Sequence, residues 1–184
     1  MKKLVLLLIF SLTFFQYGNA QRYLTKNGQI SFFSDGPLEK IEAQNNQVNS
    51  VLDVKSGDFV FKVLMKSFLF EKALMQEHFN ENYVESDQFP NATFVGKITN
   101  PEAIDFTKPG TYDAILEGKL SIHGVTKQVK EQGTFQVSTE AIVGKSVFII
   151  KLADYNISIP GAVAGKIAEE IEIRVDVRLD PLKF

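Results

Sequence analysis

The chain has two histidines, and they are its clearest candidates for proton transfer or metal binding. His78 follows Glu77 and lies a short distance before Asp87, while His123 is followed by Gly124. An imidazole beside a carboxylate can act as an acid–base pair or as part of a metal site. Neither histidine lies in an HExxH-type pattern, however, and two imidazoles with scattered carboxylates make a poor ligand set. We therefore predict no metal site and keep the acid–base pair only as an alternative.

Other catalytic patterns are missing from the sequence. There is no cysteine, which excludes a thiol nucleophile and a cysteine-ligated metal. No serine lies in a Gly-x-Ser-x-Gly context, and no glycine loop of the phosphate-binding kind is present. The simpler interpretation is that His78 packs where a short helix meets the rest of the fold, and that His123 and Gly124 shape a turn. We accordingly predict a protein that is not an enzyme and has no cofactor.

The segments that must position these residues have the pattern of β-strands. In the clearest example, 170–180, charged residues alternate with Ile171, Ile173, Val175, Val177 and Leu179. Such alternation turns one set of side chains toward a core and the other toward water. Similar patterns predict further strands at 29–34, 38–43, 47–54, 59–67, 92–98, 114–122, 129–138 and 145–153.

Short links join most of these strands, among them Asn45-Asn46 and Ser56-Gly57-Asp58. Short links favour antiparallel hairpins, and many strands in one domain favour a sandwich or a closed barrel. A barrel of about eight strands has an interior that is either filled by side chains or holds one small elongated ligand. Gly96 and Gly118 lie on the apolar faces of their strands, where they either leave room for a ligand or let the barrel bend.

One helical segment interrupts the strands at 71–80. It consists largely of strong helix formers, and Phe70, Leu74 and His78 share a face at four-residue spacing. Pro90, which follows, cannot occupy a central strand. The sequence therefore predicts a short helix and an irregular crossing between strands 59–67 and 92–98.

The first twenty residues have the features of a secretory signal peptide. Lys2 and Lys3 precede an apolar run that ends before Gly18-Asn19-Ala20, a small-residue cleavage site. The apolar run is shorter than a membrane span requires, so we predict cleavage before Gln21 and one domain over 21–184 that does not span the membrane. Removing Lys2 and Lys3 from the 20 basic residues leaves 18 against 22 acidic ones, a formal charge of −4. Without a basic cluster, nucleic acid is not an expected partner.

Two motifs together resemble the YceI-like family. The first is His78-Phe-Asn followed by Phe89-Pro-Asn-Ala-Thr-Phe94, and the second is Gly118-Lys-Leu-Ser-Ile-His123-Gly-Val-Thr-Lys127. The resemblance extends from about Gln29 to Leu182. It implies an all-β fold, a lipocalin-like antiparallel barrel of about eight strands with a short helical insertion. It also implies export to the periplasm and binding of a polyisoprenoid or similar amphiphilic lipid inside the barrel, without catalysis.

Alternation and the resemblance together predict the residues that contact the lipid. The expected wall consists of Phe61, Val63, Phe94, Ile98, Leu116, Leu120, Phe135, Phe148, Ile150, Ile173 and Val175. His78, His123 and Lys127 are the candidates for a polar mouth that holds a lipid head group. Two alternatives stay open: a solid barrel that acts through its surface, and an enzyme that uses a histidine with a carboxylate. The oligomeric state is also open, a homodimer included.

Overall fold

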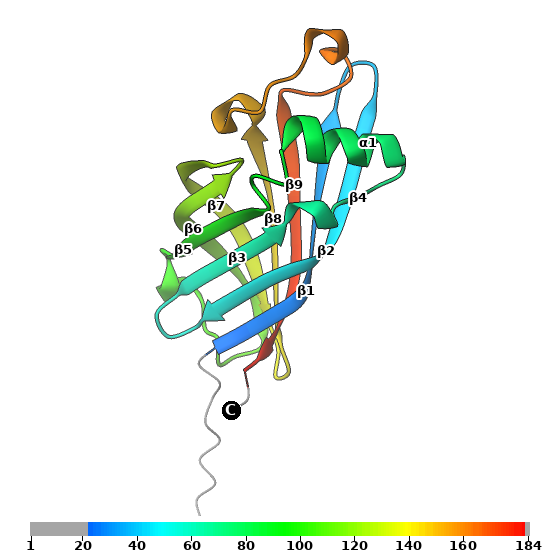
Figure 1. Cartoon of the computed structure of the whole chain (residues 1–184). Helices are drawn as coiled ribbons and strands as arrows, with labels where there is room; N and C mark the ends of the chain where they lie inside the picture. The colour runs from blue at the N-terminus through cyan, green and yellow to red at the C-terminus, as the bar shows by residue number, and fades with distance from the viewer. Residues whose placement is uncertain (1–21, 183–184) are drawn as a thin grey trace, which may run out of the picture.

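A computed structural model describes residues 22–182, and these residues form a closed antiparallel β-barrel of eight strands (Figure 1). The barrel closes because β1 pairs with both β9 and β2, so the predicted fold class is confirmed. The strands are β1 (Arg22–Asp35), β2 (Lys40–Asp53), β3 (Asp58–Leu64), β4 (Leu69–Phe70), β5 (Asn91–Ile98), β6 (Gly110–Ile122), β7 (Val125–Val137), β8 (Ile142–Lys151) and β9 (Glu170–Pro181). The two-residue β4 pairs with β2 outside the closed ring.

The prediction of a turn at Asn45-Asn46 was wrong. Both residues lie inside β2, which continues from Lys40 to Asp53 against β1 with two shifts of register. The side chain of Asn45 is fully buried, donates a hydrogen bond to the Leu64 carbonyl and accepts one from the Gln47 amide, both at 2.8 Å. The asparagine therefore satisfies backbone groups at an irregular point of a long strand, a role that resembles a turn in the sequence alone.

The predicted helical insertion is present, but only its first part is α-helical and it ends three residues later than predicted. The α-helix α1 (Ala73–His78) continues directly into a π-helical turn over Phe79–Tyr83. A 3-10 turn at Met65–Ser67 ends the preceding strand. In Figure 1, α1 lies across one end of the barrel, near the tip of the β1–β2 hairpin and the loop that precedes β9. These segments surround the end of the barrel opposite Arg22 and Leu182, where the described part of the chain begins and ends.

The alternation of apolar and polar residues in the sequence corresponds to the alternation of inward and outward side chains in the barrel wall. Phe59, Phe61 and Val63 of β3 are buried, whereas Val60 and Leu64 between and beside them are exposed. On β9, Ile171, Val177 and Leu179 are buried as expected. The inward side chains of all strands form a single apolar core.

From the sequence, Gly96 and Gly118 either leave room for a ligand or let the barrel bend, and their positions in the structure distinguish these two roles. They lie directly opposite each other on β5 and β6, and a Cβ atom on Gly118 would lie 2.4 Å from the Gly96 Cα. Neither residue lines the cavity described below. The two glycines therefore permit a close approach of neighbouring strands and do not make room for a ligand.

The ladder between β7 and β8 is incomplete. In the described part of the chain it runs from the pair Val137–Ile142 only as far as Gly133–Ser146. Beyond this point, the first half of β7 stays paired with β6, and the second half of β8 stays paired with β9. The wall of the barrel therefore has a gap between β7 and β8 on the side toward α1.

The predicted signal peptide, residues 1–20, lies outside the described residues. Over 22–182 the structure contains no helix with the length and apolar character that a membrane crossing requires.

Candidate ligand-binding cavity

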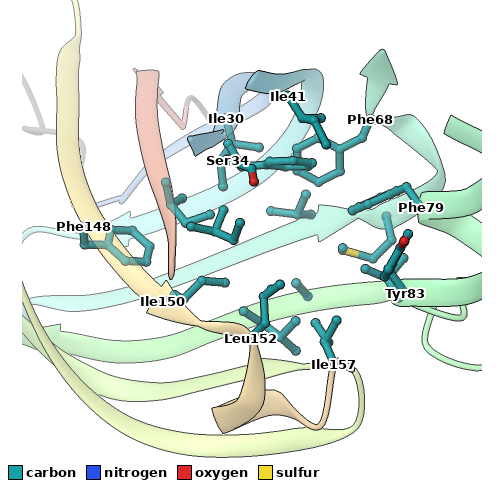
Figure 2. A pocket seen from close by; sticks show the side chains of 18 of the residues that line it. Ile30, Ser34, Ile41, Phe68, Phe79, Tyr83, Phe148, Ile150, Leu152 and Ile157 are labelled. Atoms are coloured by element: carbon teal, nitrogen blue, oxygen red, sulfur yellow. The ribbon is translucent and has the colours of Figure 1, made fainter. Parts of the chain in front are cut away.

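The barrel encloses a cavity of about 470 Å³ on the side toward α1, within the size range of small-molecule sites. Its surface is almost entirely apolar. Figure 2 shows Ile30, Phe68, Phe79, Phe148, Ile150 and Leu152 directed into it from strands and turns far apart in the sequence. A dry apolar cavity of this size does not collapse because the strands around it are fixed by their backbone ladders, and it favours an apolar occupant over water.

Most of the predicted wall residues line this cavity. The nine that do so are Phe61, Val63, Phe94, Leu116, Leu120, Phe148, Ile150, Ile173 and Val175. Phe135 and Ile98 are buried but lie outside the cavity lining. Phe135 packs against the rings of Phe59 and Phe106, with centroids 6.1 and 5.9 Å apart, in the filled part of the barrel core. The alternation identified the inward face correctly but not how far along each strand the cavity extends.

Sequence reasoning missed an aromatic cluster that covers one end of the cavity. Phe32 of β1 stacks on Phe79 at 5.5 Å, and Phe68 and Phe70 pack around the same ring at 5.5 and 5.1 Å. Edge and stacked ring pairs of this kind add stability beyond the area they bury. The alternation of Ile30, Phe32 and Ser34 indicates in the sequence that Phe32 points inward. Phe70 and Phe79 lie at the two ends of the predicted helical segment, whose spacing does not reveal that they meet Phe32, and Phe68 lies in an irregular segment.

His123 joins three separate segments outside the cavity. Its Nε2 lies 2.9 Å from Glu85 Oε2 and its Nδ1 lies 3.0 Å from the Tyr155 carbonyl oxygen, with the side chain 12% exposed. A carbonyl and an ionised carboxylate are both acceptors, so both contacts are hydrogen bonds when both ring nitrogens carry a proton. His123 and Glu85 adopt positive φ angles of 49° and 43°, which the paired side chains help to hold.

The two motifs of the sequence meet at this point. The Phe89 ring contacts the His123 ring edge-on at 4.7 Å. Gly124 has a φ of 73°, and a Cβ atom there would lie 2.6 Å from Phe89. We call the set His123, Glu85, Phe89 and Tyr155 the His123 junction. The motifs are therefore distinctive because they fasten the irregular crossing and the segment after β8 to the β6–β7 turn.

The three candidates for a polar mouth do not surround one opening. His78, on α1, lines the cavity with an exposed side chain. His123 is turned into its junction, and Lys127 forms an ion pair with Asp154 at 3.7 Å on the outside of β7. Asp87, considered as an acid near His78, forms an ion pair with Lys66 instead. In the described residues no group of three or more His, Cys, Asp or Glu side chains could hold a metal ion.

Glu131 is an acidic residue on the inner face of β7, and it lines the cavity. Burial raises the pKa of its carboxyl above the ordinary value of 4.5. Burial and the nearby charges of Asp154 and Glu131 likewise raise the pKa of the Tyr155 phenol. Burial therefore disfavours negative charge on both groups.

We expect Glu131→Gln to stabilise the protein in a pH-dependent way. A carboxyl whose pKa is raised by folding holds its proton more tightly in the native state. The wild type therefore loses stability as pH rises from the pKa of Glu131 in the unfolded chain through its higher pKa in the folded protein. The two proteins should melt at similar temperatures below pH 4.5, and the variant about 1–3 °C higher at neutral pH. Thermal melts between pH 3.5 and 8 measure the difference. Glu140→Gln, whose side chain is 84% exposed, should show no such trend.

Comparisons with known proteins agree with this geometry. Residues 22–179 match the model of the YceI-like domain, so the chain belongs to the YceI-like family. The search of curated proteins found no match.

Several solved structures have the same fold. A polyisoprenoid binding domain from Saccharophagus degradans, implicated in plant cell wall breakdown, is 13% identical with a TM-score of 0.75, over 89% of this chain and 100% of that one. Burkholderia cenocepacia BcnA is 17% identical with a TM-score of 0.69, over 83% and 95%. A Campylobacter jejuni YceI protein is 15% identical with a TM-score of 0.58, over the whole of both chains.

Proposed function

We propose that this protein is an exported, periplasmic binding protein that holds a polyisoprenoid or similar amphiphilic lipid inside its barrel. The apolar cavity carries the proposal. Each buried CH₂ group contributes roughly 0.8 kcal/mol, so a chain of a dozen or more carbons can bind without specific polar contacts. Membership of the YceI-like family and the likeness to a polyisoprenoid binding domain support this class of ligand.

A lipid should copurify with the protein from its native source, because a long chain loses many apolar contacts on leaving the cavity and is therefore released slowly. Mass spectrometry of an organic extract of the purified protein tests this directly. The expected result is a single class of long-chain amphiphile in near-stoichiometric amount. Protein that carries no amphiphile and takes up none from mixed lipid vesicles would contradict the proposal.

The sequence is also compatible with two other functions. A solid barrel that acts only through its surface does not agree with the cavity. An enzyme that uses a histidine with a carboxylate would need that pair in an open cleft. His123 does pair with Glu85 at 2.9 Å, but neither residue lines the cavity. His78 lines the cavity, whereas His123 is held in its junction away from it. We therefore propose a role in binding and transport or sequestration without chemical turnover.

If the protein is exported, its mature N-terminus should be the residue after the signal-peptide cleavage site. The basic pair Lys2 and Lys3, the apolar run and the Gly18-Asn19-Ala20 site predict that signal peptidase cleaves before Gln21. Expressed from its own start codon, the protein should be recovered from the periplasmic fraction with Gln21 as its first residue, as read by intact-mass measurement. Recovery of the uncleaved chain from the cytoplasm would overturn the proposed compartment and leave the cavity argument unchanged.

A further inference from the structure

Two carboxylates line the cavity in the described part of the chain, and only one of them has a basic partner. Glu39, near the tip of the β1–β2 hairpin, forms an ion pair with Lys72 at 3.1 Å. Glu131 lies on the inward set of β7, and its register partner on β6 is Leu116, which also lines the cavity. An acidic side chain in an apolar wall costs stability unless something compensates for it.

Glu131 lies beside the gap in the barrel wall. The β7–β8 ladder ends at Gly133 and Ser146, two residues from Glu131, and the Ser146 hydroxyl donates to the Gln132 carbonyl at this end. Past this point Phe148 and Ile150 of β8 face the cavity, although their strand is no longer paired with β7. The Glu131 carboxyl is therefore located where the apolar interior meets an opening between two strands.

The lysines of β7 and β8, the two strands that border the gap, are engaged elsewhere. Each of the four lysines on β7 and β8 near the gap has a different carboxylate: Lys130 pairs with Glu117, Lys127 with Asp154, Lys145 with Asp176 and Lys151 with Glu170. Within residues 22–182, the Glu131 carboxylate has no hydrogen bond or ion pair, and the ionisable group that its charge influences, Tyr155, is itself acidic. Lys72, His78 and Lys166 also line the cavity, but Lys72 pairs with Glu39 and neither of the other two pairs with Glu131. The charge of Glu131 is therefore without a partner until something enters the cavity.

We propose that Glu131 is the group that recognises the polar head of the bound lipid, and that it selects heads that donate a hydrogen bond or carry positive charge. This inference rests on the proposed lipid-binding function. An alcohol or an amine donates to the carboxylate, which compensates it and strengthens binding because the surroundings are apolar. A phosphate or carboxylate head brings a second negative charge into the same low-dielectric site and is repelled.

The test compares heads on one chain. Wild type and Glu131→Gln are incubated with an equimolar mixture of geranylgeraniol, geranylgeranylamine and geranylgeranyl phosphate. The ligands retained after gel filtration are quantified against labelled standards. Because both proteins meet the same mixture, differences in ligand solubility cancel when the retained ratios are compared. We expect the alcohol-to-phosphate and amine-to-phosphate ratios to fall roughly tenfold or more in Glu131→Gln, because the variant lacks the charge that repels the phosphate.

Two further variants test whether the change in the retained ligand ratios is specific to Glu131. Glu117→Gln removes a carboxylate that is paired with Lys130 on the same two strands, and it should keep the wild-type ratios. Glu131→Lys should reverse the preference toward the phosphate, and it provides a second reading if the glutamine variant folds poorly. Wild-type ratios in both Glu131 variants would overturn the role of Glu131 while leaving lipid binding in place. If wild type retains none of the three ligands, the proposed function fails as well.

Discussion

Ala92→Trp should abolish most lipid binding while leaving the barrel folded. Ala92 lines the cavity on β5, opposite the cavity-lining Val63 of β3. An indole at this position extends into the cavity and fills space that the chain of a lipid would otherwise occupy. If it excludes about four methylene groups, the affinity should fall by about 3 kcal/mol, or more than 100-fold. Titration of a geranylgeranyl ligand, followed by retention on gel filtration, measures the loss.

Val95→Trp is the matched control for this prediction. Val95 lies on the same strand, but its side chain is 56% exposed on the outside of the barrel. The same indole placed there should leave lipid affinity unchanged, since it cannot reach the cavity. Unfolding curves for both variants separate a blocked cavity from a damaged fold. Equal lipid affinity in Ala92→Trp and wild type would show that the ligand binds outside the cavity, and would overturn the proposed function.

The fold was largely predictable because a barrel wall imposes a local rule on each strand. Each strand needs one apolar face, so Phe59, Phe61 and Val63 alternate with outward residues whatever their partners are. The irregular features depend on distant partners and could not be read locally. Asn45 belongs to a strand because its amide reaches the Leu64 carbonyl, and no pattern around Asn45 reveals that contact.

The same distinction applies to the cavity. Alternation places Leu116 and Phe148 on the inner face, but the extent of the hollow depends on where the β7–β8 ladder ends, which is a property of two strands together. Phe68 follows a 3-10 turn and Phe79 begins a π-helical turn, and no local pattern shows that both rings meet Phe32 of β1. Glu131 was a visible exception, since it is an acidic residue in the inward set of a predicted strand. Its importance depends on its lack of a basic partner, which only the arrangement of the surrounding lysines reveals.

His123→Ala should destabilise the protein strongly. It removes the contacts of the ring with Glu85, with the Tyr155 carbonyl and with Phe89, at a site where the side chain is only 12% exposed. It also leaves Glu85 at a positive φ without the partner that helps to hold it. We expect a loss of about 2–3 kcal/mol in the free energy of unfolding, or roughly 5–10 °C in melting temperature. Chemical denaturation and thermal melts measure both quantities.

His78→Ala provides the control within the same chain. His78 has an exposed side chain on α1 and no hydrogen bond or ion pair in the described residues, so its removal should cost less than about 0.5 kcal/mol. The contrast separates the two histidines by role: His123 stabilises the segments that bound the barrel, whereas His78 is only a part of the cavity lining. The segment held at Tyr155 lies between the cavity-lining residues Leu152 and Ile157, so His123→Ala should also weaken lipid retention. Equal stability losses for the two variants would mean that the His123 junction contributes nothing beyond an ordinary surface histidine.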